Sequence, residues 1–183
     1  MEKITIPFLK LSAKIRQSNH VVDVFGTLAE ARSVLVFMPD KLEDFGIARK
    51  FLKNLMNDFS NAKFRFVMRE SYRSLLNGNQ NYGTIFVSAR DVNFWGLPKK
   101  ELKQKILATK YDIVIDLNDD FHLTSTYLCL KSRASLKICF DHDKRESFYN
   151  FYFRAQANTS LNNKYQKLIQ YLKNDVTSET AEV

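Results

Sequence analysis

The chain contains little glycine, proline or cysteine: five, three and two residues, respectively, among 183. It has no GxGxxG and no GxxxxGK[ST] pattern, which argues against a dinucleotide site and against a P-loop. It also lacks a GxSxG elbow, and its three histidines show no HExxH or similar metal-ligand spacing. These absences exclude the commonest nucleotide-binding, serine hydrolase and zinc-dependent chemistries.

The two cysteines, Cys129 and Cys139, lack CxxC spacing and fall in a helical pattern and a strand pattern. We interpret them as reduced core thiols of a cytoplasmic protein, with a structural disulfide as the alternative. No apolar stretch approaches the roughly 20 residues that span a bilayer. The start MEKITIPFLK has no signal-peptide core. We therefore expect a soluble cytoplasmic protein without a transmembrane segment.

The net charge is +8 and the pI is about 9.4, which raises the question of an anionic partner. The basic residues are spread along the chain and accompany no zinc-finger or RRM pattern, so we expect a solvated helix face and no nucleic-acid partner. They are densest at Lys99, Lys100, Lys103, Lys105 and Lys110. Near the N-terminus, PFLKLSAKIRQ has the pattern of a short amphipathic helix, which would dock on the domain or associate weakly with a membrane surface.

Short apolar runs alternate with helical patterns in β-α-β order, which predicts an α/β protein with one doubly wound, Rossmann-like domain. We expect five parallel strands in the order 3-2-1-4-5, with helices on both faces of the sheet. A helical extension over residues 1–32 would precede this domain at 33–174, and a disordered tail would occupy 175–183. The predicted strands are Val34–Phe37, Phe64–Val67, Thr84–Val87, Ile113–Ile115 and Leu136–Phe140.

The spacing of apolar residues predicts helices between and after these strands. A crossover helix is expected near 42–59, a shorter one at 71–76, and another opening at Pro98. Further helices are expected near 123–131 and 160–173. The turn signal NGNQNYG precedes the third strand.

Acidic segments follow three of the predicted strands: PDKLED, DLNDDFH and DHD. Because the carboxyl ends of parallel strands share one edge of the sheet, several of these side chains could converge there. Three interpretations stay open: helix caps and turn residues, a ligand crevice, or a divalent-cation site. We predict no metal or cofactor. The acidic residues are Asp40, Glu43, Asp44, Asp116, Asp119, Asp120, Asp141 and Asp143. The predicted ligand-binding residues are Asp40, Glu43, Asn118, Asp119, Asp120 and His122.

In order and spacing, four segments resemble the N-terminal domain of the heptosyltransferase-type glycosyltransferases, family nine, which have a two-domain GT-B fold. The resemblance covers about residues 33–153, and its order and spacing carry more weight than any single motif. The segments are VLVFMPDKLEDFGIARKFLKNL, NAKFRFVMRESYRSLL, KYDIVIDLNDDFH, and LKICFD followed by RESFYNFYF.

By this resemblance, Asp44 occupies the position of the family's catalytic base, which would deprotonate the hydroxyl of an acceptor sugar. Glu43 stands where the family has glycine, and no counterpart of the second, donor-binding domain follows. We therefore expect a stand-alone domain that is a non-catalytic binding or assembly module, with a glycan or sugar ligand and a protein partner or homo-oligomer. The resemblance implies a role in bacterial envelope-glycan metabolism.

Two alternatives stay open. The first is a half-enzyme that completes a glycosyltransferase site with a partner protein or as a homodimer. The second is a basic accessory protein on RNA or on a large assembly, for which association would depend steeply on salt.

Overall fold

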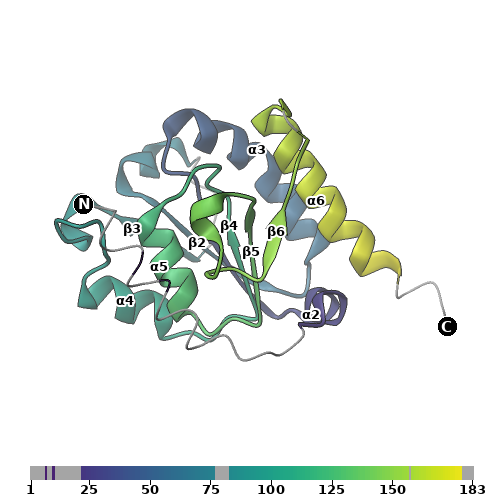
Figure 1. Ribbon diagram of the computed structural model, residues 1–183, viewed down its shortest axis with the longest axis horizontal. Helices are drawn as coiled ribbons and strands as arrows, with labels where there is room; N and C mark the ends of the chain where they lie inside the picture. The colour runs from purple at the N-terminus through teal and green to yellow at the C-terminus, as the bar shows by residue number, and fades with distance from the viewer. Residues whose placement is uncertain (1–6, 8–9, 11–21, 77–82, 157, 179–183) are drawn as a thin grey trace.

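Six parallel strands form one sheet at the centre of the protein (Figure 1). The computed structural model describes residues 7, 10, 22–76, 83–156 and 158–178. The strand order is β3-β2-β1-β4-β5-β6, which confirms the doubly wound order 3-2-1-4-5. The prediction of five strands is wrong, because a short sixth strand pairs with β5 and extends the sheet. The strands are β1 (Ser33–Phe37), β2 (Lys63–Arg69), β3 (Gly83–Val87), β4 (Ile113–Asp116), β5 (Leu136–Phe140) and β6 (Phe151–Phe153).

The two central strands, β1 and β4, lie side by side although they are far apart in the sequence. Val34 pairs with Ile113 and Phe37 pairs with Asp116. From β1 the chain builds outward through β2 and β3 on one side, and from β4 through β5 and β6 on the other. The switch point therefore lies between β1 and β4, and the loops that follow these two strands meet at the same edge of the sheet.

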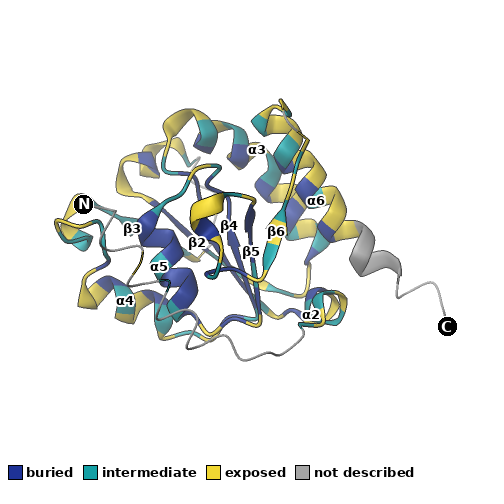
Figure 2. Cartoon of the chain, in the orientation of Figure 1, coloured by how far each residue is buried: buried dark blue, intermediate teal, exposed yellow. Residues whose placement is uncertain are grey.

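Helices cover both faces of the sheet, so the strands are buried on both sides (Figure 2). Successive side chains of a strand point to opposite faces. Val34 and Val36 therefore pack under α2 (Val24–Glu30), α3 (Leu42–Asp58) and α6 (Leu161–Ser178), whereas Leu35 and Phe37 pack under α4 (Lys100–Leu107) and α5 (Leu123–Lys131). Because both faces are covered by helices, most positions of these strands are apolar in the sequence.

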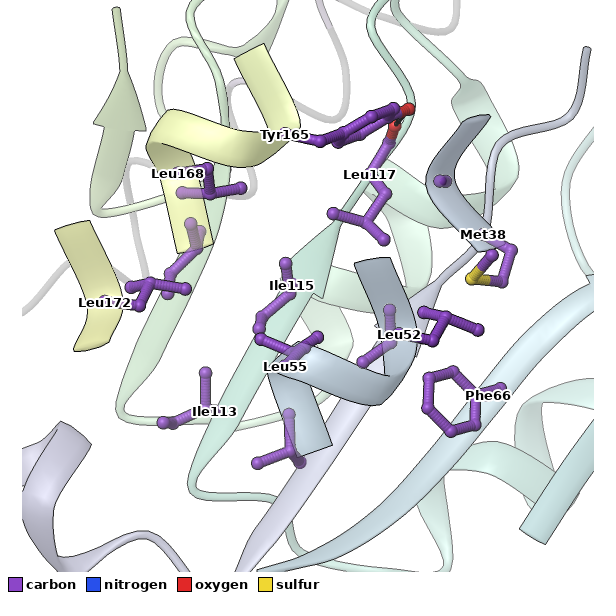
Figure 3. Packing of buried hydrophobic residues seen from close by; sticks show 14 of the residues in the cluster. Met38, Leu52, Leu55, Phe66, Ile113, Ile115, Leu117, Tyr165, Leu168 and Leu172 are labelled. Carbon is purple, nitrogen blue, oxygen red and sulfur yellow. Dashed lines mark hydrogen bonds between the residues drawn. The ribbon is translucent and has the colours of Figure 1, made fainter. Parts of the chain in front are cut away.

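The larger of the two apolar clusters lies between the sheet and the pair α3 and α6 (Figure 3). Leu52 and Leu55 of α3 and Leu168 of α6 pack against β4, whose Ile113 and Ile115 are fully buried. At the upper end of this cluster, the hydroxyl of Tyr165 donates to the Leu117 carbonyl at 2.7 Å. Helix α6 is therefore fixed to the loop that follows β4.

Several elements differ from those expected. Residues 71–76 were predicted as α-helix, but a 3₁₀ helix, η1 (Glu70–Leu75), occupies most of this stretch. Helix α4 begins at Lys100, because Pro98 instead forms an isolated antiparallel bridge with Val92. Helix α2 lies within residues 1–32, where a helical extension was expected without bounds for this helix; Asp23 caps it by accepting from the Gly26 amide at 3.0 Å. Helix α6 extends to Ser178. Two further 3₁₀ helices are η2 (Ala89–Asp91) and η3 (Asp143–Arg145).

Three expectations fall wholly or partly on residues that the structure does not describe. The predicted amphipathic helix PFLKLSAKIRQ lies there except for Pro7 and Lys10, as do residues 77–82 of the predicted turn and residues 179–183 of the tail. No helix within the described ranges is both long enough and apolar enough to cross a membrane.

Candidate functional site

A pocket of about 450 Å³ opens at the carboxyl ends of β1, β2, β3 and β4. Its apolar lining comes from the last residues of these strands and from the loops that follow them, and includes Phe37, Met38, Val67, Met68, Val87 and Val92. Polar side chains around this lining come from the loops and from the first turns of η1 and α5. They are Asp40, Arg69, Glu70, Ser71, Ser88, Asn118, His122, Thr124 and Ser125. The pocket therefore lies where a doubly wound sheet is expected to hold its ligand.

Asp40, after β1, is held by groups from three other segments. Its backbone N–H donates to the side-chain oxygen of Asn118 at 2.9 Å. Its carbonyl accepts from the Tyr72 hydroxyl at 2.5 Å, and its carboxylate accepts from Arg69 at 3.3 Å. The Asp40 carboxylate is thereby fixed at the pocket margin, with a cationic donor beside it.

The loop after β4 is organised by Asp116, a fully buried carboxylate at the end of that strand. One carboxylate oxygen accepts from the backbone and side-chain N–H groups of Asn118 at 3.0 and 2.7 Å. The other accepts from Ser125 at 2.7 Å and from the Tyr149 hydroxyl at 2.6 Å. Burial, together with the charge of Asp116, raises the pKa of Tyr149, so this hydroxyl keeps its proton and donates it to the carboxylate.

These bonds give Asn118 a positioning role. Its N–H₂ group donates to Asp116 and its oxygen accepts from Asp40, so the side chain joins the loop after β4 to the loop after β1. The Ser125 hydroxyl is similarly committed, because it donates to Asp116 and is itself buried. Although both residues line the pocket, their main hydrogen bonds hold the two loops together.

The positive charge that faces Asp116 comes from Arg145, whose side chain is fully buried. Its guanidinium donates to the carbonyls of Asn118 at 2.8 Å and Phe140 at 3.3 Å, and also to that of Asp120. Burial disfavours the charged form, but Asp116, Tyr149 and Cys139 together outweigh it, and the pKa of Arg145 is raised. The guanidinium therefore stays charged, and its hydrogen bonds hold the backbone of the loop after β4 in place.

His122 stands at the N-cap of α5 and closes the pocket between β1 and β4. Its Nδ1 accepts from the Ser125 amide at 3.4 Å. In the tautomer in which Nδ1 accepts this bond, the ring proton is on Nε2, which lies 4.0 Å from a carboxylate oxygen of Asp40. The imidazole can thus donate from Nε2 to a ligand or to Asp40.

A second polar group, which we name the acid–lysine cluster, contains Lys41, Asp44, Asp119, Asp120 and Lys164. Lys164 donates to both carboxylate oxygens of Asp119, at 2.7 and 2.9 Å, and Lys41 donates to Asp120. Burial and the negative charges of Asp119 and Asp120 raise the pKa of Asp44, while Lys41 opposes this rise. None of these five residues is among those that line the pocket.

The predicted site residues therefore separate into two groups. Asp40, Asn118 and His122 line the pocket, whereas Asp44, Asp119 and Asp120 belong to the acid–lysine cluster. Glu43 is exposed in the first turn of α3 and lies outside the pocket. From the third acidic segment, Asp141 forms an ion pair with Arg154 at 2.6 Å.

Sequence reasoning missed the polar pocket residues at the carboxyl ends of β2 and β3, which are Arg69, the last residue of β2, and Glu70, Ser71 and Ser88 after these strands. They do not form an acidic segment like those that follow β1, β4 and β5. Their position directly after a predicted strand was a signal that could have found them, because the edge rule applies to every strand of a parallel sheet.

The described ranges contain no group of three His, Cys, Asp or Glu residues that could hold a metal ion. Cys129 and Cys139 are both free and buried, in agreement with their interpretation as core thiols. Burial raises the pKa of Cys129 well above its ordinary value and that of Cys139 to about 12. Neither thiol is suited to nucleophilic work.

The fold is that of part of a family-nine glycosyltransferase. Escherichia coli heptosyltransferase WaaC, solved with ADP, is 18% identical with a TM-score of 0.59; the match covers 76% of this chain and 46% of that one. A family 9 glycosyl transferase from Veillonella parvula is 21% identical with a TM-score of 0.60, over 77% of this chain and 41% of that one. For E. coli ADP-heptose heptosyltransferase II the identity is 15% and the TM-score 0.56, over 75% and 40%. The predicted resemblance is confirmed at the level of the fold, and the chain spans less than half the length of each structure.

By sequence, the chain belongs to a family of unknown function, DUF6913, whose model matches residues 6–174. No curated protein matches the chain.

Proposed function

We propose that the protein is a non-catalytic sugar-binding module of the cytoplasm, and that its ligand occupies the pocket at the carboxyl edge of the sheet. The observation that carries this proposal is the lining, which combines an apolar surface with both donors and acceptors of hydrogen bonds. The volume of about 450 Å³ falls within the range of small-molecule sites. The two free, buried thiols fit a reducing compartment.

The charges of the lining favour a polyhydroxylated ligand over a phosphorylated one. The lining contains two carboxylates, Asp40 and Glu70, and one guanidinium, that of Arg69. Arg69 pairs with Asp40 at 3.3 Å, whereas Glu70 pairs at 3.6 Å with Arg73, which is not among the lining residues. Two carboxylates would repel a phosphate group, whereas they accept readily from sugar hydroxyls. Arg69 and the Nε2 atom of His122 supply donors for the same hydroxyls, whereas the Ser88 hydroxyl already donates to Asp91 at 2.7 Å.

The location of Asp44 supports a non-catalytic role. A general base must lie within hydrogen-bond reach of the hydroxyl that it deprotonates. Asp44 is in the acid–lysine cluster and does not line the pocket. Solved relatives of the same fold carry ADP or ADP-2-deoxy-2-fluoro heptose, which supports a ligand related to sugar metabolism.

Calorimetric titration with a panel of neutral sugars, including an aldoheptose, tests the proposal, with ADP as the phosphorylated comparison. We expect a neutral sugar to bind more tightly than ADP, and Arg69→Ala to weaken sugar binding about tenfold by removing a charged donor. Arg154→Ala is the matched control, because Arg154 also pairs with an aspartate but lies outside the pocket. No sugar binding, or equal loss in both variants, contradicts the proposal.

A second candidate is a half-enzyme completed by a partner protein or by a second copy of the chain. The raised pKa of Asp44 favours it, because a general base works best when its pKa lies closer to neutral pH. Under this alternative, sugar transfer from a nucleotide sugar requires the partner and disappears in Asp44→Asn. Turnover by the purified protein, abolished by the same substitution, would also defeat the non-catalytic proposal.

A further inference from the structure

Two large aromatic side chains project into solvent from the loop between β3 and α4. Phe94 is 76% exposed and Trp95 is 55% exposed, and their rings lie edge to face with centroids 5.6 Å apart. We name this pair the aromatic tip. The segment that carries it loops outward at the left edge of the view in Figures 1 and 2. The tip is not part of the pocket lining, so its exposure has a separate explanation.

The backbone around the aromatic tip satisfies much of its own hydrogen bonding. The side chain of Asn93 accepts from the amides of Trp95 and Leu97, both at 3.0 Å. The Asn93 amide donates to the Leu97 carbonyl at 2.8 Å, and the Gly96 amide donates to the Asn93 carbonyl at 2.9 Å. Paired backbone groups lower the free-energy cost of entering an apolar medium.

The scaffold fixes the orientation of the tip. The Thr124 hydroxyl, in the first turn of α5, donates to the Gly96 carbonyl at 2.6 Å. Gly96 has φ = 80°, a left-handed conformation that favours glycine. At the base of the loop Val92 pairs with Pro98, and the Lys99 amide donates to the Asp91 carbonyl at 2.8 Å. The tip is therefore presented by a preorganised loop.

Basic residues flank the tip along the chain. Residues 89–110 contain six basic and two acidic side chains and so carry a net charge of +4. This is half of the chain's net charge of +8, in 22 of its 183 residues. Arg90, Lys99 and Lys100 are exposed. The basic residues are Arg90, Lys99, Lys100, Lys103, Lys105 and Lys110, and the acidic ones are Asp91 and Glu101. Apolar side chains flanked by basic residues complement a surface that has anionic groups on the outside and an apolar interior beneath them.

We propose that the aromatic tip inserts into the interfacial region of an anionic lipid bilayer, with Arg90, Lys99 and Lys100 against the headgroups. Tryptophan prefers the membrane interface, and lysine side chains can follow the surface with their charged ends. Single-stranded RNA is less suited, because its bases stack on aromatic platforms along a groove, whereas these rings project from the tip of a loop. The inference is independent of the sugar pocket.

Trp95 makes the proposal directly measurable, because it is the only tryptophan in the chain. Its fluorescence is followed while the full chain is titrated with vesicles of phosphatidylcholine alone, or of phosphatidylcholine with phosphatidylglycerol. We expect a blue shift and quenching by lipids brominated on their acyl chains with the anionic vesicles, and a weaker response with the neutral ones. High salt should reduce the affinity for the anionic vesicles.

Two variants and a control separate the contributions. Phe94→Ser should weaken binding to anionic vesicles at least about tenfold, because a large apolar contact is lost. The double variant Lys99→Glu and Lys100→Glu should abolish the preference for anionic lipid. Leu42→Ser is the control: Leu42 is 57% exposed, but on α3, and its replacement should leave vesicle binding unchanged. Circular dichroism melting checks that each variant folds.

Three results would overturn the proposal. The first is no spectral change with anionic vesicles. The second is equal loss of binding in Phe94→Ser and Leu42→Ser. The third is quenching of Trp95 by single-stranded RNA without any response to vesicles, which would assign the tip to nucleic acid.

Discussion

At the scale of single residues, the ionisation of Asp44 depends on a small set of neighbours. Burial contributes most to its raised pKa, and Asp119 and Asp120 add to the rise. Lys41 is the opposing charge, and it also donates to Asp120. Removing one of these neighbours should therefore shift the pKa of Asp44 in a direction set by the charge that is removed.

We expect Lys41→Ala to raise the pKa of Asp44 further, because the nearby cation is lost and Asp120 loses its partner. Asp119→Asn should lower the pKa, because it removes one negative charge and frees Lys164 from its pairing. NMR titration of the side-chain carboxyl carbons measures both shifts. Lys63→Ala, an exposed change on β2, serves as the control. If the pKa of Asp44 is the same in all three variants, the acid–lysine cluster is not electrostatically coupled.

At the scale of the elements, β4 contributes side chains to both apolar clusters. All four of its residues are buried: Ile113 and Ile115 face α3 and α6, whereas Val114 faces the opposite cluster. Its last residue, Asp116, then organises the loop at the pocket. Core packing and site geometry therefore meet in one short strand.

We expect Ile115→Ala to lower the free energy of unfolding by about 2–5 kcal/mol, because it opens a cavity at a fully buried position. Leu42→Ala, on the exposed side of α3, should change it by no more than about 0.5 kcal/mol. Urea unfolding followed by circular dichroism measures both. Similar values for the two variants would show that β4 is not the packed centre of the sheet.

The elements that sequence predicted best are those with the clearest physical signal. Continuous apolar runs marked β1 to β5, because strands buried on both faces need apolar side chains at every position. Strand β6 was missed: it has three residues, and Tyr152 at its centre is exposed. The predicted start of helix α4 was Pro98, because proline is common in a first helical turn. In the structure Pro98 forms a bridge with Val92, and the helix begins at Lys100.

The candidate site was predicted only in part. The edge rule predicts that Asp40, Asn118 and His122 lie at one edge of the sheet, and all three line one pocket, whereas their role in ligand binding stays a prediction. It could not assign Asp119 to the other group, because that depends on Lys164 of α6, a helix 45 residues further along the chain. The positioning role of Asn118 was equally invisible, since it follows from side-chain bonds to two separate loops.

At the scale of the whole molecule, the two central strands are also joined at their amino ends. A carboxylate oxygen of Asp112, just before β4, accepts from the amides of Arg32 and Ser33 at 3.0 and 2.9 Å, and from the Ser33 hydroxyl at 2.9 Å. Burial acts to raise the pKa of Asp112, but these hydrogen bonds outweigh it and the pKa is lowered. The ionised form is therefore favoured by folding.

This lowered pKa predicts the direction of acid sensitivity. The stabilisation from Asp112 is fully present above its unfolded pKa of 3.8 and is lost as pH falls through the lower folded value. At pH 7, Asp112→Asn should reduce the free energy of unfolding by about 1–3 kcal/mol, and the variant should lose less stability on acidification. Glu30→Gln, an exposed change on α2, is the control. Chemical unfolding across the acid range tests both points, and parallel pH profiles for wild type and Asp112→Asn would contradict them.

The pairing of β1 with β4 has a consequence for synthesis of the chain on the ribosome. Val34 and its partner Ile113 are 79 residues apart, so β1 waits for its second neighbour while that length is translated. At about 5–20 residues per second this interval is roughly 4–16 s. During it, the apolar run of Ser33–Phe37 has one unpaired edge, and such an edge can pair with a foreign chain. The nascent protein therefore passes through an aggregation-prone stage that ends only when β4 itself has emerged.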